Sequence, residues 1–260
     1  MEQFILFGDS LTQQAFSHEH GALGPALTDA YIRRLDVINR GFSGYNTTQA
    51  LQVLPLFMPS PSRARVRFFA IWLGANDARL PNTPGGPQQH VPLEQYKANL
   101  KAIATHPCVQ AHQGIRVLII TPPPVDERMM LDVDGVARDG QSPPRRTSMT
   151  TSLYAAAACD VGAALGIAVL DLWHATMLRI PNSIVKRDNA YYYAGMLHVA
   201  ESASLQKLLR DGLHLSRAGY EVCFQELMRC IDRLWPDQIP DQLPFVFPRW
   251  DDERAWIATR

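Results

Sequence analysis

The chain has 260 residues, of which 47% are hydrophobic, and its 25 basic side chains equal its 25 acidic ones. This length favours one large α/β domain, or at most two small ones. A formal net charge of zero argues against a general nucleic-acid binder or a protein of anionic membrane surfaces, because those usually carry a basic excess. No run approaches ~18 uninterrupted apolar residues, so we expect no transmembrane helix.

The chain begins with Met1-Glu2-Gln3 and passes directly into a short apolar run, without the basic start and longer apolar stretch of a secretory signal. Its four cysteines are sparse and form no C-x-x-C pair. Sparse cysteines of this kind are typical of reducing compartments. We therefore expect reduced thiols in a cytoplasmic protein.

Five short β-rich runs alternate with segments of helical spacing. Alternation of strands and helices predicts a parallel sheet covered by helices on both faces. Two of the runs are nearly continuous in apolar residues, as is typical of strands buried on both sides. The predicted strands are 4–8, 36–41, 66–74, 115–121 and 167–173, and the clearest predicted helices are 23–35, 47–57, 93–104, 148–165 and 216–235.

Two inserts interrupt this alternation, at 124–148 and at 181–204. Both follow the carboxyl ends of predicted strands, where open α/β sheets bind ligands, so we expect both near the rim of an active site. In the first, Asp134-Gly135 lies between two short runs, 131–133 and 136–138, and predicts a β-hairpin. In the second, three successive tyrosines occupy 191–193. They could form a recognition patch, but we expect their rings to be buried against the insert.

The motif Gly8-Asp9-Ser10-Leu11 follows the first predicted strand. A serine there is presented at the carboxyl edge of the sheet, where it could act as a nucleophile. Taken alone, the motif equally fits a turn or a helix cap, because glycine, aspartate and serine all favour turns.

The motif Asp211-Gly212-Leu213-His214 stands just before the last predicted helix, for which Ser216 is a suitable N-cap. An aspartate and a histidine three residues apart in a tight turn can pair through Oδ and Nδ1. That pairing fixes the histidine tautomer and leaves Nε2 free to act as a base. Taken alone, this motif also fits a polar turn with a surface histidine.

Two further motifs follow the second and third predicted strands. Gly44, in the run 41–47, could offer a backbone N–H where a side chain would block approach. Asn76, in the run 72–77, could supply a side-chain N–H donor. Each motif alone is compatible with an ordinary turn, but the carboxyl ends of parallel strands bring all four motifs to one rim. Together they provide a nucleophile, a base, an orienting carboxylate and oxyanion donors, which acyl transfer requires.

The four motifs resemble the SGNH subgroup of the GDSL hydrolases, whose characteristic Ser, Gly, Asn and His match Ser10, Gly44, Asn76 and His214. The resemblance extends from the first predicted strand to the last predicted helix. Within that subgroup, the runs 41–47, 73–78, 121–127, 211–216 and 243–250 resemble the isoamyl acetate-hydrolysing esterase branch.

The resemblance implies a flavodoxin-like three-layer α/β/α sandwich with a five-stranded parallel sheet. It implies one SGNH hydrolase domain over 1–260, ending in a C-terminal tail at 236–260. It implies that Ser10 is the nucleophile, His214 the general base and Asp211 its partner. The implied oxyanion hole consists of the Ser10 and Gly44 backbone N–H groups and the Asn76 side chain. No metal and no organic cofactor is implied.

We therefore predict a serine esterase that hydrolyses short-chain, mostly uncharged carboxylic esters of the acetyl type through an acyl-enzyme. The expected partner is a small-molecule ester, with no nucleic acid and no integral membrane association, and both a monomer and a homodimer stay open. The alternatives are a thioesterase or lysophospholipase, a carbohydrate deacetylase on the same fold, and a non-catalytic flavodoxin-like scaffold. The complete set of site residues favours an enzyme, since a scaffold has no reason to keep it.

Other chemistries find little support in the sequence. The run 41–45 lacks the final glycine of a Gly-x-Ser-x-Gly elbow, and phosphate-loop and dinucleotide fingerprints are absent. The segment His18-Glu19-His20 lacks the ligand spacing of a metal site, so we interpret it as a surface loop. The run 132–135 does not continue as a calcium-binding loop would.

Overall fold

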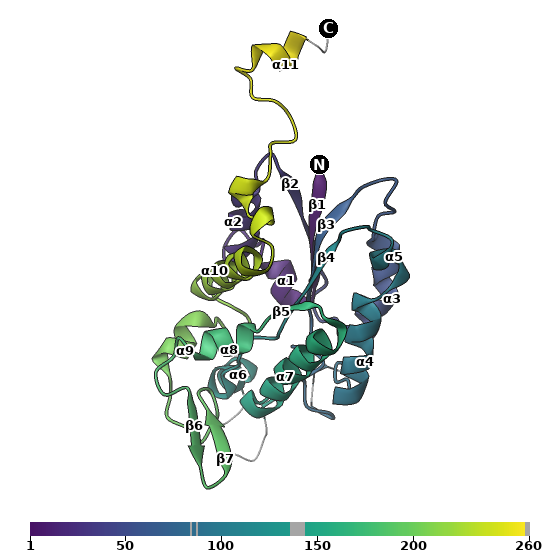
Figure 1. Cartoon of the computed structure of the whole chain (residues 1–260). Helices are drawn as coiled ribbons and strands as arrows, with labels where there is room; N and C mark the ends of the chain where they lie inside the picture. The colour runs from purple at the N-terminus through teal and green to yellow at the C-terminus, as the bar shows by residue number, and fades with distance from the viewer. Residues whose placement is uncertain (84, 87, 136–143, 258–260) are drawn as a thin grey trace.

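A parallel sheet of five strands forms the centre of the computed structural model (Figure 1). The structure describes residues 1–83, 85–86, 88–135 and 144–257. The strands are β1 (Glu2–Gly8), β2 (Leu35–Gly41), β3 (Val66–Trp72), β4 (Arg116–Ile120) and β5 (Ala168–Leu170). Their order is β2-β1-β3-β4-β5, and every neighbouring pair is parallel. The predicted five-stranded parallel sheet is confirmed.

Helices cover both faces of the sheet and produce three layers (Figure 1). Successive side chains of β1 point to opposite faces, so Phe4 and Leu6 join one buried core while Ile5 and Phe7 join the other. The first core is closed by α2 (Leu23–Ala30), α8 (Leu172–Met177) and α10 (Arg217–Leu234), and the second by α3 (Thr47–Phe57), α4 (Leu93–Ala104) and α7 (Ser148–Leu165). The predicted three-layer α/β/α sandwich is confirmed.

The strand order places a switch point between β1 and β3, where the chain changes the direction in which it adds strands. Loops that leave the carboxyl ends of strands at such a point commonly form the binding crevice of an α/β sheet. The shorter elements are α1 (Ser10–Gln14), α5 (Pro107–Gln110), α6 (Glu127–Asp134), β6 (Ile184–Arg187), β7 (Ala190–Tyr193), α9 (Ala203–Leu208), the 3₁₀ turns Pro236–Gln238 and Pro240–Gln242, and α11 (Glu253–Ile257).

Local sequence signals set most helix ends. Helices α3, α4 and α7 begin and end at the predicted residues. Helix α10 begins directly after Ser216, whose Oγ accepts a hydrogen bond from the Gly219 N–H at 3.3 Å, as expected of an N-cap. Helix α2 ends at Ala30 rather than at residue 35, because Leu35 already pairs with Glu2 in the sheet.

The hairpin predicted around Asp134-Gly135 is wrong in its first half, because 131–133 belong to α6. Asp126 caps this helix by accepting a hydrogen bond from the Met129 N–H at 3.0 Å, and Gly135 ends it with φ of 64°. A left-handed glycine serves a helix C-cap as well as a hairpin turn, so Asp-Gly does not distinguish the two. The second half, 136–138, lies outside the described residues.

A hairpin occurs instead in the second insert, where β6 and β7 pair antiparallel. Asp188 and Asn189 form its two-residue turn with φ of 46° and 61°, the conformation of a type I′ turn. The expected burial of the three tyrosines is wrong for Tyr191, which is 49% exposed. Period-two alternation puts Tyr191 and Tyr193 on one face, and Tyr193 packs edge-on against Trp173. Tyr192 packs edge-on against His198.

The C-terminal tail leaves α10 at the end of the molecule opposite the β6–β7 hairpin (Figure 1). Arg33 and Arg34 place their guanidinium carbons 4.3 and 4.5 Å from the centroid of the Phe245 ring. The Val246 N–H also donates to the Arg33 carbonyl at 3.0 Å. Cation–π contacts and this hydrogen bond therefore fasten the tail near the start of β2. Among the described residues, no helix is long and apolar enough to cross a membrane.

Candidate active site

Ser10 is the first residue of α1 and follows β1 after a single residue, Asp9. The Asp9 side chain caps α1, because Oδ1 accepts a hydrogen bond from the Leu11 N–H at 2.9 Å. A Cβ atom on Gly8 would lie 2.2 Å from Thr12 Oγ1 and 2.2 Å from the Trp72 carbonyl oxygen, so only glycine fits there. This tight strand-to-helix turn holds Ser10 at the carboxyl edge of the sheet with 6% of its surface exposed.

His214 lies in the turn that leads into α10 and connects Ser10 to Asp211. Its Nε2 is 3.0 Å from Ser10 Oγ, and its Nδ1 is 2.7 Å from Asp211 Oδ2. Because an ionised carboxylate can only accept, Nδ1 carries the proton and Nε2 is free to accept the Ser10 hydroxyl proton. The structure thus brings together these three predicted site residues, although Ser10 and His214 are 204 positions apart in the chain.

Hydrogen bonds within the turn 211–214 hold the Asp211 carboxyl group and favour its ionised form. Its Oδ1 accepts hydrogen bonds from the Leu213 N–H at 3.0 Å and the His214 N–H at 2.8 Å. Burial alone would raise the pKa of Asp211, but the hydrogen bonds from the His214 side chain and from the two backbone N–H groups outweigh it, so this pKa lies below its usual range. The carboxylate is therefore charged at neutral pH and can stabilise an imidazolium on His214.

The segment after β4 packs against the turn that carries His214 and is hydrogen-bonded to it. The Asp126 N–H donates to the Gly212 carbonyl at 2.9 Å. Gly212 has φ of 84°, and a Cβ atom there would lie 2.4 Å from the Asp126 carbonyl oxygen. A side chain at Gly212 would therefore both strain the backbone and push the turn away from its support.

The Gly44 and Asn76 motifs meet beside the Ser10 motif. The Phe42 N–H donates to the Gly8 carbonyl at 2.9 Å, which joins the loop after β2 to the serine turn. Gly44 has φ of 85°, a conformation that side-chain-bearing residues rarely adopt. Asn76 Nδ2 donates to the Tyr45 carbonyl at 2.9 Å, so this amide lies against the Gly44 loop with 4% of its surface exposed. All four predicted motifs thus converge on one edge of the sheet.

A buried arginine that the sequence did not single out lies behind Asn76. Arg146 is 2% exposed and donates from Nη2 to Asn76 Oδ1 at 2.7 Å and from Nε to the Ala75 carbonyl at 2.5 Å. It stands in the first insert, 70 positions from Asn76, with no spacing that relates the two residues. Only its pairing with Arg145 directly before the α7 cap distinguished it in the sequence, and that pattern suits a solvated surface equally well.

Two buried carboxyl groups, Asp9 and Asp77, are the sequence neighbours of Ser10 and Asn76. Desolvation raises the pKa of Asp9 to about 6 and that of Asp77 to about 7. Thr47 partly opposes this shift at Asp77, since its backbone N–H and its hydroxyl donate to Asp77 Oδ1 at 3.0 and 2.5 Å. Within the described residues, Oδ2 of Asp9 and Oδ2 of Asp77 meet no hydrogen-bond partner from the protein. Perturbed carboxyl groups of this kind concentrate at functional sites.

The described residues contain no cluster of three or more His, Cys, Asp or Glu side chains that could hold a metal ion. His18, Glu19 and His20 lie in a turn at the surface, with Glu19 Oε2 3.4 Å from His20 Nε2. The interpretation of this segment as a surface loop is confirmed.

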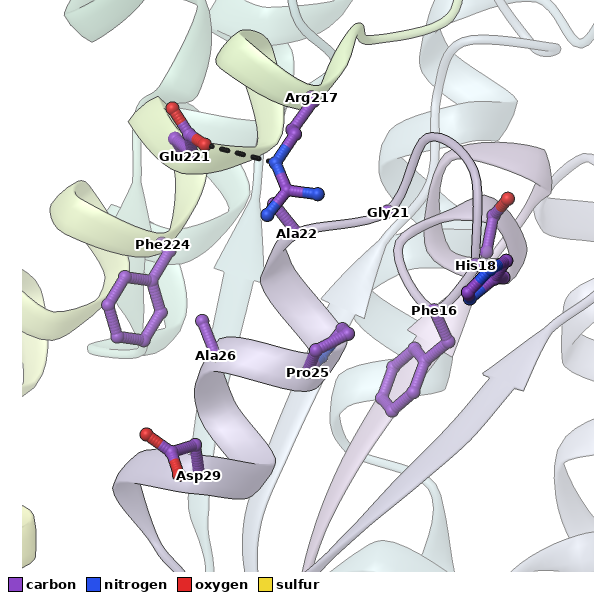
Figure 2. A pocket seen from close by; sticks show the side chains of 11 residues that line it. Phe16, His18, Gly21, Ala22, Pro25, Ala26, Asp29, Arg217, Glu221 and Phe224 are labelled. Carbon is purple, nitrogen blue, oxygen red and sulfur yellow. Dashed lines mark ion pairs between the residues drawn. The ribbon is translucent and has the colours of Figure 1, made fainter.

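A cavity of about 670 Å³ opens between α2 and α10, outside the site just described. Figure 2 shows Phe16, Pro25 and Phe224 around it, and Arg217 paired with Glu221 across an N–O distance of 3.4 Å at its rim. None of the predicted site residues lines this cavity.

The chain is similar to known proteins over most of its length. Residues 6–222 match the GDSL-like Lipase/Acylhydrolase family. A GDSL esterase/lipase of Arabidopsis thaliana is 34% identical over 95% of this chain and 91% of its own length. The isoamyl acetate-hydrolyzing esterase 1 homologue of Mus musculus is 34% identical over 95% of this chain and 86% of its own length. The human homologue is 33% identical, over 96% and 87%.

Solved structures show the same fold. The lipase/acylhydrolase from Enterococcus faecalis superposes with a TM-score of 0.60 at 24% identity, covering 94% of this chain and 98% of that one. An acetylxylan esterase from Geobacillus stearothermophilus has a TM-score of 0.58 at 18% identity, over 88% and 94%. The chain belongs to the GDSL-like lipase/acylhydrolase family, and it is an enzyme of the GDSL/SGNH hydrolase class. Within that family it is similar to the isoamyl acetate-hydrolyzing esterase homologues.

Proposed function

We propose that this protein is a serine esterase in which Ser10, His214 and Asp211 form the catalytic triad. The observation that carries the proposal is the unbroken chain of hydrogen bonds from Ser10 Oγ through both ring nitrogens of His214 to Asp211. This is the arrangement of a nucleophile, a base and an orienting carboxylate that acyl transfer uses.

Ser10 Oγ attacks the ester carbonyl carbon while His214 Nε2 takes the hydroxyl proton. The tetrahedral intermediate expels the alkoxide, which leaves as an alcohol after His214 returns the proton to it. Water then attacks the acyl-enzyme by the same route, with His214 again as the base. The products are the carboxylic acid and the free serine.

The oxyanion of the intermediate is held by the Ser10 and Gly44 backbone N–H groups and by the Asn76 side chain. Asn76 Nδ2 carries two protons, of which the Tyr45 carbonyl takes one. The second proton is directed elsewhere by the trigonal geometry of the amide, and we assign it to the oxyanion. Donors fixed before the reaction lower the barrier because they need no reorganisation when the charge develops.

The substrate we propose is a short-chain, mostly uncharged carboxylic ester, such as an acetate ester. The similarity to isoamyl acetate-hydrolyzing esterase homologues over nearly the whole chain supports this choice. A thioesterase, a lysophospholipase and a carbohydrate deacetylase would use the same triad and differ in the groups that flank the scissile bond.

The test is a panel of p-nitrophenyl esters from acetyl to palmitoyl, run with the wild type and with Ser10→Ala. We expect the highest kcat/KM for the shortest acyl chains, and Ser10→Ala should reduce it by about 10⁴-fold or more. A fluorophosphonate should label the wild type once and leave Ser10→Ala unlabelled. Ser17→Ala, a neighbouring serine outside the site, serves as the matched control and should retain full activity.

Undiminished turnover by Ser10→Ala would remove the nucleophile assignment. A maximum at long acyl chains, or a preference for thioesters or acetylated sugars over simple acetates, would replace the proposed substrate class while leaving the triad in place.

A further inference from the structure

Arg146 is a charged side chain placed where burial is costly. It precedes the α7 N-cap, and 2% of its surface is exposed. Taking a guanidinium out of water is unfavourable unless its donors find good acceptors. Its two described acceptors, the Ala75 carbonyl and Asn76 Oδ1, both belong to the Asn76 motif at 72–77. Arg146 is therefore hydrogen-bonded to Asn76, the side chain that we assign to the oxyanion hole.

One edge of the Arg146 guanidinium holds the Asn76 motif through two hydrogen bonds, which together we call the clamp. Nε donates to the Ala75 carbonyl at 2.5 Å and Nη2 to Asn76 Oδ1 at 2.7 Å. Two parallel donors on one rigid plane fix both the peptide after Ala75 and the Asn76 amide. A lysine ammonium is a point donor on a flexible stem and does not reproduce this planar fork.

The clamp also decides which way the Asn76 amide points. A guanidinium has no acceptor, so the amide atom facing it must be the oxygen. The opposite amide atom lies 2.9 Å from the Tyr45 carbonyl, which has no donor, so that atom must be the nitrogen. A flipped amide would place Nδ2–H against the Arg146 Nη2–H group and Oδ1 against the Tyr45 carbonyl oxygen, and neither pair could form a hydrogen bond. Only the orientation with Nδ2 toward the Gly44 loop satisfies both neighbours.

The charge of Arg146 has a second effect on this amide. Burial, reinforced by repulsion from Arg79 and Arg145, lowers the pKa of Arg146 to about 10, which still leaves it protonated at neutral pH. A cation that binds the amide oxygen draws electron density from the nitrogen and so makes Nδ2–H a stronger donor. The effect is greatest in a buried environment, where water does not screen it.

We propose that Arg146 is the positioning residue of the oxyanion hole: it holds the Asn76 amide with Nδ2–H toward the developing oxyanion and strengthens that donor. This inference rests on the proposed function, since it assumes that Asn76 is an oxyanion donor. The described hydrogen bonds of Arg146 go to Ala75 and Asn76 and not to Ser10, so in this proposal Arg146 acts through Asn76.

The test is a double-mutant cycle between Arg146 and Asn76, measured with a short p-nitrophenyl ester. Asn76→Ala should lower kcat by ~10²–10³-fold, the usual loss of an oxyanion donor. Arg146→Lys and Arg146→Gln should each lower kcat by about tenfold or more, a part of that loss, with KM changed less than about twofold because the oxyanion exists only in the transition state. In the Asn76→Ala background the same Arg146 substitutions should lower kcat less than about twofold, because the group they act through is gone.

Arg67→Lys is the matched control. Arg67 also donates two hydrogen bonds from one guanidinium, to Glu2 at 2.5 Å and to Gln238 at 2.7 Å, but it stands at the amino end of β3. Its substitution should leave kcat unchanged, and circular dichroism with thermal unfolding should show all variants folded at the assay temperature.

The outcomes separate this inference from the proposed function. Wild-type kcat in both Arg146 variants, or an equal fold-loss in the wild-type and Asn76→Ala backgrounds, would overturn the positioning role while leaving the triad intact. Failure of both Arg146 variants to fold, when Arg67→Lys and Asn76→Ala do fold, would also overturn it in favour of a purely structural role. An unchanged kcat in Asn76→Ala would refute the oxyanion assignment on which the inference depends.

Discussion

The two edges of the central sheet treat their charged groups in opposite ways. At the carboxyl edge, Asp9, Asp77 and Arg146 are at most 2% exposed. Burial shifts the pKa of each in the direction that favours the neutral form. At the amino edge, Glu2 pairs with Arg65 and Arg67 at the surface, at 3.1 and 2.5 Å. Buried charge weakens a fold and persists where chemistry needs it, whereas surface pairs are close to neutral for stability. The carboxyl edge therefore carries buried charge that lowers stability, whereas the amino edge carries ion pairs that cost little.

Asp211→Asn should give the largest effect that separates the two edges. The backbone N–H groups of Leu213 and His214 would hold the amide oxygen at the present Oδ1 position, so the amide N–H₂ would face His214 Nδ1. That contact forces the proton onto Nε2, which then cannot accept the Ser10 proton. We expect kcat to fall by about 10⁴-fold, as expected for a triad histidine in the wrong tautomer, with the fold unchanged by circular dichroism.

Asp29→Asn on the exposed face of α2 is the control for Asp211→Asn and should leave kcat unchanged. A loss smaller than about tenfold in Asp211→Asn would show that another acceptor orients His214, and the role assigned to Asp211 would then be withdrawn.

Asp77→Asn should reveal what buried charge does to stability. The pKa of Asp77 is about 7 in the folded protein, above its ordinary value near 4, so between about pH 4 and 7 the folded state binds more protons than the unfolded state. Wild-type stability from this group therefore falls as pH rises through that window, and it stays low above it. Asp77→Asn keeps an acceptor for Thr47 and removes the charge, so it should flatten the slope and be more stable than the wild type at pH 8.

Denaturant unfolding at about pH 4.5, 6 and 8 measures this prediction, and the difference between the variant and the wild type reports on Asp77 together with its charge repulsion from Asp9, whose pKa is raised into the same pH window. Asp211 does not interfere, because its lowered pKa contributes stability that is lost only below about pH 4. A variant that is less stable than the wild type at pH 8, with an unchanged slope, would contradict the assignment of a destabilising buried charge to Asp77.

Glu2→Gln at the amino edge should have the smallest effect. It breaks the ion pairs with Arg65 and Arg67, which are partly exposed. We expect the free energy of unfolding to fall by about 1 kcal/mol or less, because water and salt screen such pairs, and kcat to be unchanged. A loss of activity in Glu2→Gln would show that the two edges are coupled and would weaken the contrast drawn here.

The sequence predicted the five strands, the main helices and the four motifs, because each depends on nearby residues. Thr47–Phe57, for example, is bounded by Asn46, which forms a capping box with Gln49. The first insert was harder, since the left-handed Gly135 ends a helix but suits a hairpin equally well. The β6–β7 hairpin went unpredicted although Asp188-Asn189 is a suitable type I′ turn, because the flanking strands are short and only partly alternating.

By itself the sequence placed Asp211 within reach of His214 and Ser10 at the end of a strand, because a separation of three residues and a position directly after a strand are local properties of the chain. Only the tertiary structure decided that His214 Nε2 reaches Ser10 Oγ across 204 positions, and that Arg146 clamps Asn76 across 70. Such contacts depend on the order in which the strands assemble and on where the chain before α7 places Arg146. No local spacing records that order, so the partner of Asn76 could be found only once the sheet and its inserts were folded together.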